Sequence, residues 1–74
     1  MKQTEFTSKL REARLFALSL LSEDYIFVLE WVDERTNSAF IKLRHRSNGN
    51  TIKITAQRDK WQANKNGKLI KLVH

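Results

Sequence analysis

The order of apolar and polar side chains divides the chain into a helical part and a part made of strands. Between about residues 4 and 22, apolar residues recur at the i, i+4 and i+7 positions that form one face of a helix. That stripe consists of Phe6, Leu10, Ala13, Ala17 and Leu20 or Leu21, widened by Phe16. We predict one helix over about 4–22 with Thr4 as its N-cap. Leu15 and Leu18 lie outside the stripe; we expect the rest of the domain to cover them, and the alternative is a second contact surface.

The chain after Asp24 has the composition and alternation of strands. Asn48-Gly49 and Asn66-Gly67 are dipeptides that two-residue type I′ hairpin turns prefer, and Arg58-Asp59 is a weaker candidate for a third tight turn. The fold class is therefore α+β, an N-terminal helix packed on an antiparallel meander of four or five strands. The predicted strands are about 25–32, 38–46, 50–57, 60–64 and 68–73.

The predicted turns also specify which residues face each other. Around Asn48-Gly49, Leu43 pairs with Ile54 and Arg44 pairs with Lys53. This register places the apolar residues of the alternating strands on one face. The other two turns predict the pairs Ala56–Trp61, Ile54–Ala63, Ala63–Ile70 and Trp61–Leu72.

The segment 25–32 is apolar on both sides, so alternation does not decide which side faces the core. A four-residue loop after it would bury Glu30 against Ile41, which is costly for a carboxylate. We therefore expect a five-residue loop, Asp33–Asn37, which leaves Glu30 outside near Lys42. This choice puts Tyr25, Phe27, Leu29 and Trp31 on the core face. The predicted core contains Leu10, Phe27, Leu29, Ile41, Leu43, Ile54 and Trp61.

Charge is distributed unevenly between the two halves. Residues 1–37 carry five Lys/Arg and seven Asp/Glu, whereas residues 38–74 carry nine Lys/Arg and one acid, Asp59. The net charges are −2 and +8, which predicts a positive surface facing an anionic partner, with nucleic acid the leading candidate. Arg44 opposite Lys53 would be a destabilising like-charge pair, and an anionic partner is the economical explanation for it. The register predicts an outer sheet face of Ile26, Val28, Glu30, Phe40, Lys42, Arg44, Arg46, Lys53, Lys60 and Lys71.

We expect a small, cytoplasmic, non-enzymatic protein that binds DNA or RNA with low sequence specificity. Lys and Arg would neutralise phosphates, and Phe40 would stack on an unpaired base. The sequence leaves open DNA versus RNA, the oligomeric state, and whether the last two strands close the sheet into a barrel. The predicted contacts are Phe40, Lys42, Arg44, Arg46, Lys53, Arg58, Lys60, Lys65, Lys68 and Lys71.

Three alternatives compete with this interpretation. The basic face could be solvated and serve only to deter edge pairing. The chain could be an inhibitor or adaptor that docks on an acidic protein or adds an edge strand to another sheet. A ribonuclease toxin could use His45, between two arginines, as a general base. The register instead turns His45 toward the core, near Ile52 and Tyr25, where packing or a tyrosine hydrogen bond is expected. Trp31 and Trp61 are expected to be core anchors.

Composition narrows the remaining functions. Seventy-four residues are expected to form one domain with little room for a deep catalytic pocket. The chain has no Cys, and its two His lack a nearby acid cluster, so no metal, cofactor or small-molecule substrate is expected. The N-terminus lacks the apolar region of a signal peptide. The densest apolar stretches, Leu15–Leu21 and Tyr25–Leu29, are too short to cross a membrane.

Overall fold

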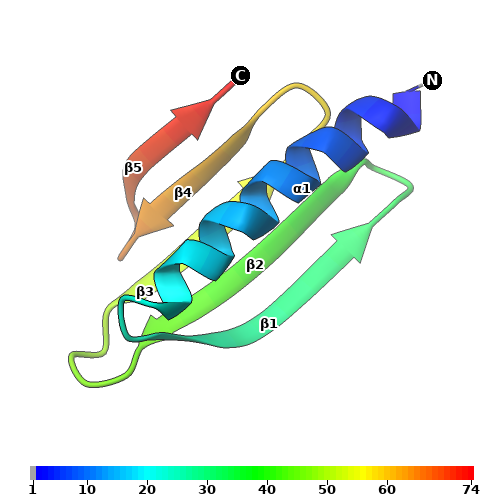
Figure 1. Cartoon of the computed structure of the whole chain (residues 1–74). Helices are drawn as coiled ribbons and strands as arrows, with labels where there is room; N and C mark the ends of the chain where they lie inside the picture. Colours follow the sequence, from blue (N-terminus) through cyan, green and yellow to red (C-terminus); the bar gives the residue numbers. More distant parts are fainter. Residues whose placement is uncertain (1) are drawn as a thin grey trace.

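One helix lies across one face of an open, five-stranded antiparallel sheet in the computed structural model, which describes the backbone of residues 2–74 and the side chains from Glu5 onward (Figure 1). The sheet order follows the chain, so β1 and β5 are its two edges and the sheet does not close into a barrel. The α+β prediction is confirmed. The helix begins before Thr4, so the N-cap prediction is wrong. The elements are α1 (Lys2–Leu21), β1 (Tyr25–Asp33), β2 (Ser38–His45), β3 (Thr51–Ala56), β4 (Trp61–Lys65) and β5 (Lys68–Val73).

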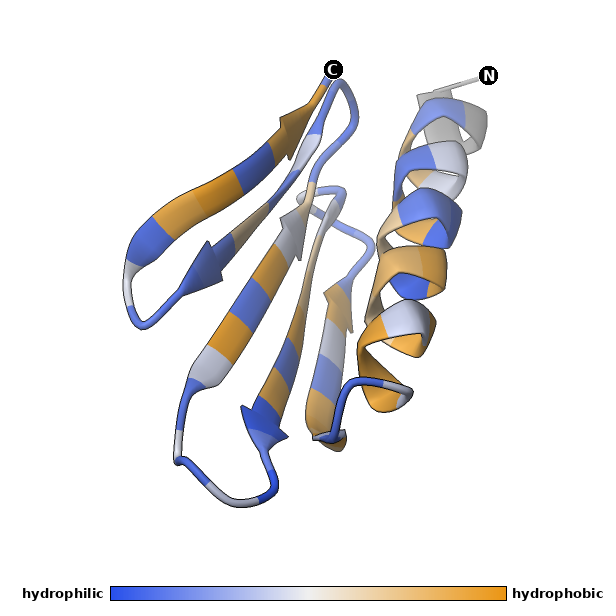
Figure 2. Cartoon of the chain, turned by 60° about the vertical axis from the view of Figure 1, so that its left-hand side comes forward, coloured by the Kyte–Doolittle hydropathy of each residue, from blue (hydrophilic) through white to orange (hydrophobic). Residues whose placement is uncertain are grey.

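The core lies between α1 and the sheet, and Figure 2 shows that the helix covers only one sheet face. A ring contact and a hydrogen bond attach the helix to β4. Trp61 packs against Phe16 with ring centroids 5.3 Å apart, and its Nε1 donates to Glu12 Oε1 over 3.0 Å. The buried apolar residues are Phe6, Leu10, Ala13, Ala17, Leu20, Tyr25, Ala39, Ile41, Leu43, Ile52, Ile54, Ala56, Trp61 and Ala63. The helical stripe is thus confirmed, whereas Leu15 and Leu18 remain exposed, against expectation.

The β2–β3 connection is longer than predicted. Leu43 pairs with Ile52 rather than Ile54, and the N–H of His45 donates to the carbonyl of Asn50 over 2.7 Å. A type I′ turn needs positive φ at both central residues, but of the dipeptide Asn48-Gly49 only Gly49 has it. The register therefore shifts by two residues, which keeps every side chain on its predicted face.

The β3–β4 and β4–β5 hairpins have their turns at the predicted residues, but a β-bulge interrupts the pairing of β4 with β5. The turn at Arg58-Asp59 has its expected pairs. Asn66 and Gly67 both have positive φ, as a type I′ turn requires. A β-bulge between the Ala63 and Asn64 pairs then moves β5 by one residue. Ala63 consequently faces Lys71 rather than Ile70, and Trp61 faces Val73 rather than Leu72.

The main error of the sequence prediction is the assignment of side chains to faces in β1, which is wrong from Leu29 onward. The loop is four residues long, so Glu30 pairs with Ile41 and Trp31 pairs with Phe40. Leu29 and Trp31 therefore project from the outer face. A bulge between Phe27 and Leu29 returns Phe27 to the helix side, where it is 55% exposed. Leu29 is 46% exposed, so neither residue belongs to the core as predicted.

Glu30 can occupy the helix side of the sheet because its carboxylate is paired there with Arg14. The Nε and Nη2 atoms of Arg14 on α1 donate to its two carboxylate oxygens over 3.0 and 2.8 Å. Both side chains stay partly open to solvent. The hydrogen bonds from Arg14 lower the pKa of Glu30 from its ordinary value. The expected burial cost does not arise, because the carboxylate is neither fully buried nor unpaired.

Candidate nucleic-acid interface on the outer sheet face

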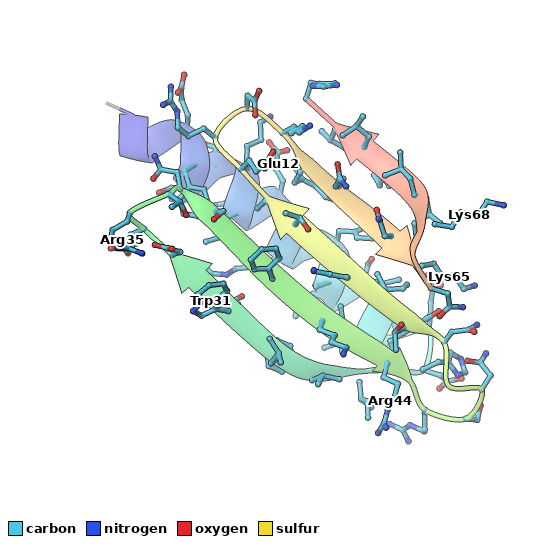
Figure 3. All side chains as sticks on the ribbon, turned by 180° about the vertical axis from the view of Figure 1, so that it is seen from behind. Glu12, Trp31, Arg35, Arg44, Lys65 and Lys68 are labelled. Atoms are coloured by element: carbon cyan, nitrogen blue, oxygen red, sulfur yellow. The ribbon has the colours of Figure 1, made fainter. Side chains whose placement is uncertain are left out.

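The sheet face turned away from α1 is uncovered, and Figure 3 views it directly, with Trp31 and Arg44 labelled on it. The register arranges its side chains in rows that run across the strands. The rows are Trp31–Phe40–Thr55–Gln62–Leu72, Leu29–Lys42–Lys53–Asn64–Leu69 and Ile26–Arg44–Thr51. We call five of these side chains, gathered on β1, β2 and β3, the outer-face platform: Trp31, Phe40, Lys42, Arg44 and Lys53.

An aromatic pair forms one side of the outer-face platform. The rings of Trp31 and Phe40 are nearly parallel, 9° apart in orientation, with centroids separated by 5.6 Å. Trp31 is 57% exposed, so its prediction as a core anchor is wrong, whereas Trp61, 4% exposed, is one. The sequence signal for Trp31 was available, since a four-residue loop places it directly opposite Phe40. Aromatic pairs in such positions stabilise sheets.

Two lysines, Lys42 and Lys53, lie beside this aromatic pair in the neighbouring row of the outer face. Lys53 places its Nζ 4.7 Å from the centroid of the Phe40 ring. Because β2 lies between β1 and β3, Lys53 and Trp31 approach Phe40 from opposite sides. Lys42 lies directly opposite Lys53, so the like-charge pair is Lys42–Lys53 and not the predicted Arg44–Lys53. Like charges in this position destabilise a strand pair.

Acidic side chains are scarce on this face. Among the outward positions of the five strands, Asp33 at the far end of β1 is the one carboxylate. Its Oδ1 accepts a hydrogen bond from the N–H of Arg35 over 3.0 Å and lies 3.7 Å from Nε of the same residue. The positive charges of the outer-face platform are therefore not neutralised by neighbours on the sheet.

An open hollow of about 370 Å³ lies on the outer-face platform. Its walls combine the two aromatic rings with the apolar side chain of Leu29 and the amino groups of two lysines. This combination suits a ligand that has a flat apolar part and a negatively charged part. Its lining residues are Leu29, Trp31, Phe40, Lys42 and Lys53.

Two further predicted contacts lie in the β3–β4 turn, at the end of the sheet opposite to Arg44. Arg58 is in the β3–β4 turn, where its Nε is 3.6 Å from Glu5 Oε1 of α1. Lys60 is half-buried in the same turn. The contact with Glu5 therefore draws Arg58 toward α1 and away from the outer-face platform. Arg46, in contrast, follows β2 directly at the end where Arg44 lies, and its N–H donates to the carbonyl of Asp24 over 2.8 Å.

The predicted lysines of the β4–β5 hairpin belong to the helix side of the sheet. Lys65 pairs with the buried Ile52, and Lys68 pairs with Lys65, so both occupy helix-side positions. Lys71 is also on that side, with its Nζ 6.0 Å from the centroid of the Phe16 ring. The bulge in β5 is the reason that the outer-face prediction for Lys71 is wrong.

His45 packs on the helix side, as expected. Its ring meets that of Tyr25 edge to face, with centroids 5.0 Å apart and planes at 89°. Its Nδ1 accepts hydrogen bonds from the N–H groups of Ser47 and Asn48 over 3.2 and 3.3 Å. These bonds engage the Nδ1 lone pair within the β2–β3 connection.

Residues 2–74 contain no group of three or more His, Cys, Asp or Glu side chains that could hold a metal ion. No helix in this range combines the length and the apolar character needed to cross a bilayer. No known protein family, curated protein or solved structure matches the chain.

Proposed function

We propose that the chain is a non-enzymatic protein that binds single-stranded nucleic acid on the outer-face platform, with low sequence specificity. The observation that carries the proposal is the stacked pair of exposed Trp31 and half-buried Phe40, next to lysines that have no carboxylate in their row of the outer face. Proteins that bind single strands without sequence preference combine a basic surface with aromatic rings on which bases stack.

Each part of the platform has a physical role in this proposal. A base in the hollow contacts the ring of Trp31, and stacking requires that this base is unpaired. Lys42 and Arg44 are two positions apart on β2, so they project from the same face about 6–7 Å apart. They can therefore contact successive phosphates of one strand. Contacts of this kind are independent of sequence and weaken with salt.

Binding assays with Trp31 variants test the stacking role. A gel-shift panel of single- and double-stranded DNA and RNA should show preference for the single-stranded forms. Trp31→Ala should weaken that binding about 5–150-fold, since one base stack contributes about 1–3 kcal/mol. Trp31→Phe should retain most of the affinity. Trp31 is the exposed tryptophan, so bound oligonucleotide should quench fluorescence in the wild type but not in Trp31→Phe.

Two double variants that remove the same charge test where on the sheet nucleic acid binds. Lys42→Ala/Lys53→Ala and Lys65→Ala/Lys68→Ala each remove two positive charges, the first pair from the outer face and the second from the helix side. The first variant should flatten the slope of log K against log salt by about 1.4, or 0.7 per lost phosphate contact. The second should change it much less. Equal effects would mean that net charge and not the platform determines binding.

An acidic partner protein that docks on the same lysines is the second candidate. Lys42 opposite Lys53 favours any anionic partner, but such a protein would not need the exposed Trp31. Polyglutamate therefore separates the two. Under the nucleic-acid proposal, polyglutamate competes poorly with an oligonucleotide and leaves Trp31 fluorescence unchanged. If the wild type binds no oligonucleotide even at low salt, the proposal fails and the acidic-partner candidate replaces it.

A further inference from the structure

The two edges of the sheet are protected differently. An edge strand presents unpaired backbone N–H and C=O groups, and proteins commonly protect such edges with lysine or proline. β5 carries Lys68 and Lys71. β1 is nine residues long and contains no Lys, Arg or Pro. The β1 edge is therefore the one that can accept another strand.

Apolar side chains are exposed on both faces of β1. Phe27 is exposed on the helix side, and Leu29 and Trp31 are exposed on the outer side. Beside Phe27, a groove of about 210 Å³ separates β1 from α1, and Leu18 and Leu21 of α1 form part of its wall. A helix docked in this groove would cover the helix side only. A strand added to β1 would cover apolar surface on both faces.

The exposed apolar area is sufficient for a dimer. An aromatic side chain offers on the order of 150–250 Å², with Leu and Val toward the lower end, and six residues of β1 and the adjacent end of α1 are each about half exposed. One copy therefore contributes roughly 500–700 Å², and two copies together reach the lower end of stable interfaces, about 1,200 Å². The largest apolar patch of a typical monomer is about 300–600 Å² and is often functional, so this surface lies at the upper end of that range or above it. The six residues are Leu18, Leu21, Phe27, Val28, Leu29 and Trp31.

The charges of β1 are already paired within the chain. Glu30 binds Arg14 of α1, and Asp33 lies 3.7 Å from Nε of Arg35. A partner for this edge therefore needs to be apolar and close to neutral. β1 itself has that character, whereas residues 38–74 carry a net charge of +8 and would repel each other in an edge contact through β5.

We propose that the β1 edge is a self-association surface, at which a second copy of this chain adds its own β1 antiparallel about a two-fold axis. In such a contact the same strand serves both copies, as in most soluble dimers. The two sheets join into one continuous sheet, and each Phe27 is covered from the partner's side. Because a strand adds in the plane of the sheet, the partner covers Leu29 and Trp31 only from the edge and leaves the outer face of β2 and β3 open, and this inference does not depend on nucleic-acid binding.

Sedimentation equilibrium of the purified full chain over a range of concentrations tests the proposal. The wild type should reach twice the mass of one chain. Leu29→Lys places a charge on the β1 edge and should raise the dimer dissociation constant at least tenfold. Leu69→Lys is the matched control, because Leu69 is exposed to a similar degree on β5. It should dimerise like the wild type. Circular dichroism should show that both variants are folded.

Hydrogen exchange gives a second measurement without any substitution. The amides of β1 should become better protected as the protein concentration rises, while those of β5 should not. A wild type that stays monomeric at every concentration would overturn the proposal. So would a dimer that Leu69→Lys dissociates and Leu29→Lys leaves intact, since that result would place the interface at β5.

Discussion

The ion pair between Arg14 and Glu30 connects α1 to the edge strand β1, and its contribution to stability can be measured directly. A double-mutant cycle would use Arg14→Gln, Glu30→Gln and the combined variant. The pair has two charge-assisted hydrogen bonds of 3.0 and 2.8 Å, but half of the Arg14 side chain is open to solvent. Exposed pairs contribute about 0.2–1 kcal/mol, and the bidentate geometry places this one near the upper end, at about 0.5–1 kcal/mol.

Chemical and thermal unfolding at fixed protein concentration measure this coupling energy. In a domain of this size it corresponds to about 2–8 °C in Tm. The pair Arg58–Glu5 is the matched control, because it also joins α1 to the sheet but has a single contact of 3.6 Å and a carboxylate more exposed than that of Glu30. Its cycle should give a coupling energy near zero.

The coupling should also depend on pH in a defined direction. Glu30 has a pKa below the ordinary value of 4.5 in the folded chain, so its ionised form stabilises the fold. This contribution is complete above the unfolded-state pKa and is lost as the pH falls through the lowered, folded-state pKa. The coupling measured at pH 7 should therefore disappear in strong acid. A coupling energy within experimental error at pH 7, or one unchanged in acid, would refute this account of Glu30.

Two more substitutions test the core and the role of His45. Leu43→Ala should reduce the free energy of unfolding by about 2–5 kcal/mol without changing the m-value, because Leu43 is fully buried. The control Leu69→Ala, on the exposed β5, should reduce it by less than about 0.5 kcal/mol. Equal losses in the two variants would contradict the assigned faces. His45→Gln should preserve oligonucleotide affinity, since the ring packs on Tyr25 away from the outer-face platform. Multiple-turnover RNA cleavage by the wild type that this variant lacks would instead support the ribonuclease alternative.

The sequence alone was sufficient to predict the helix, the strands, and which faces of β2 and β3 are buried. The helical stripe and the alternation in β2 and β3 each have one period, so one face of each element must be buried. This placed Lys42, Arg44 and Lys53 on the outer face correctly. The two-residue slip at Asn48-Gly49 did not disturb that result, because a shift by two residues changes partners but not faces. It did replace Arg44 by Lys42 as the partner of Lys53.

Tertiary structure decided the positions for which local pattern gives two answers. β1 is apolar on both sides, so its phase depends on Arg14, sixteen residues away, which gives Glu30 a partner on the helix side. That single pairing turns Trp31 outward and creates the aromatic part of the outer-face platform. The bulge in β5, which moves Lys71 to the helix side, likewise has no mark in the sequence pattern. Periodicity predicts which face of a strand is buried only when one face is apolar and the other is polar. Where both faces are apolar, as in β1, tertiary contacts decide which face packs on the core.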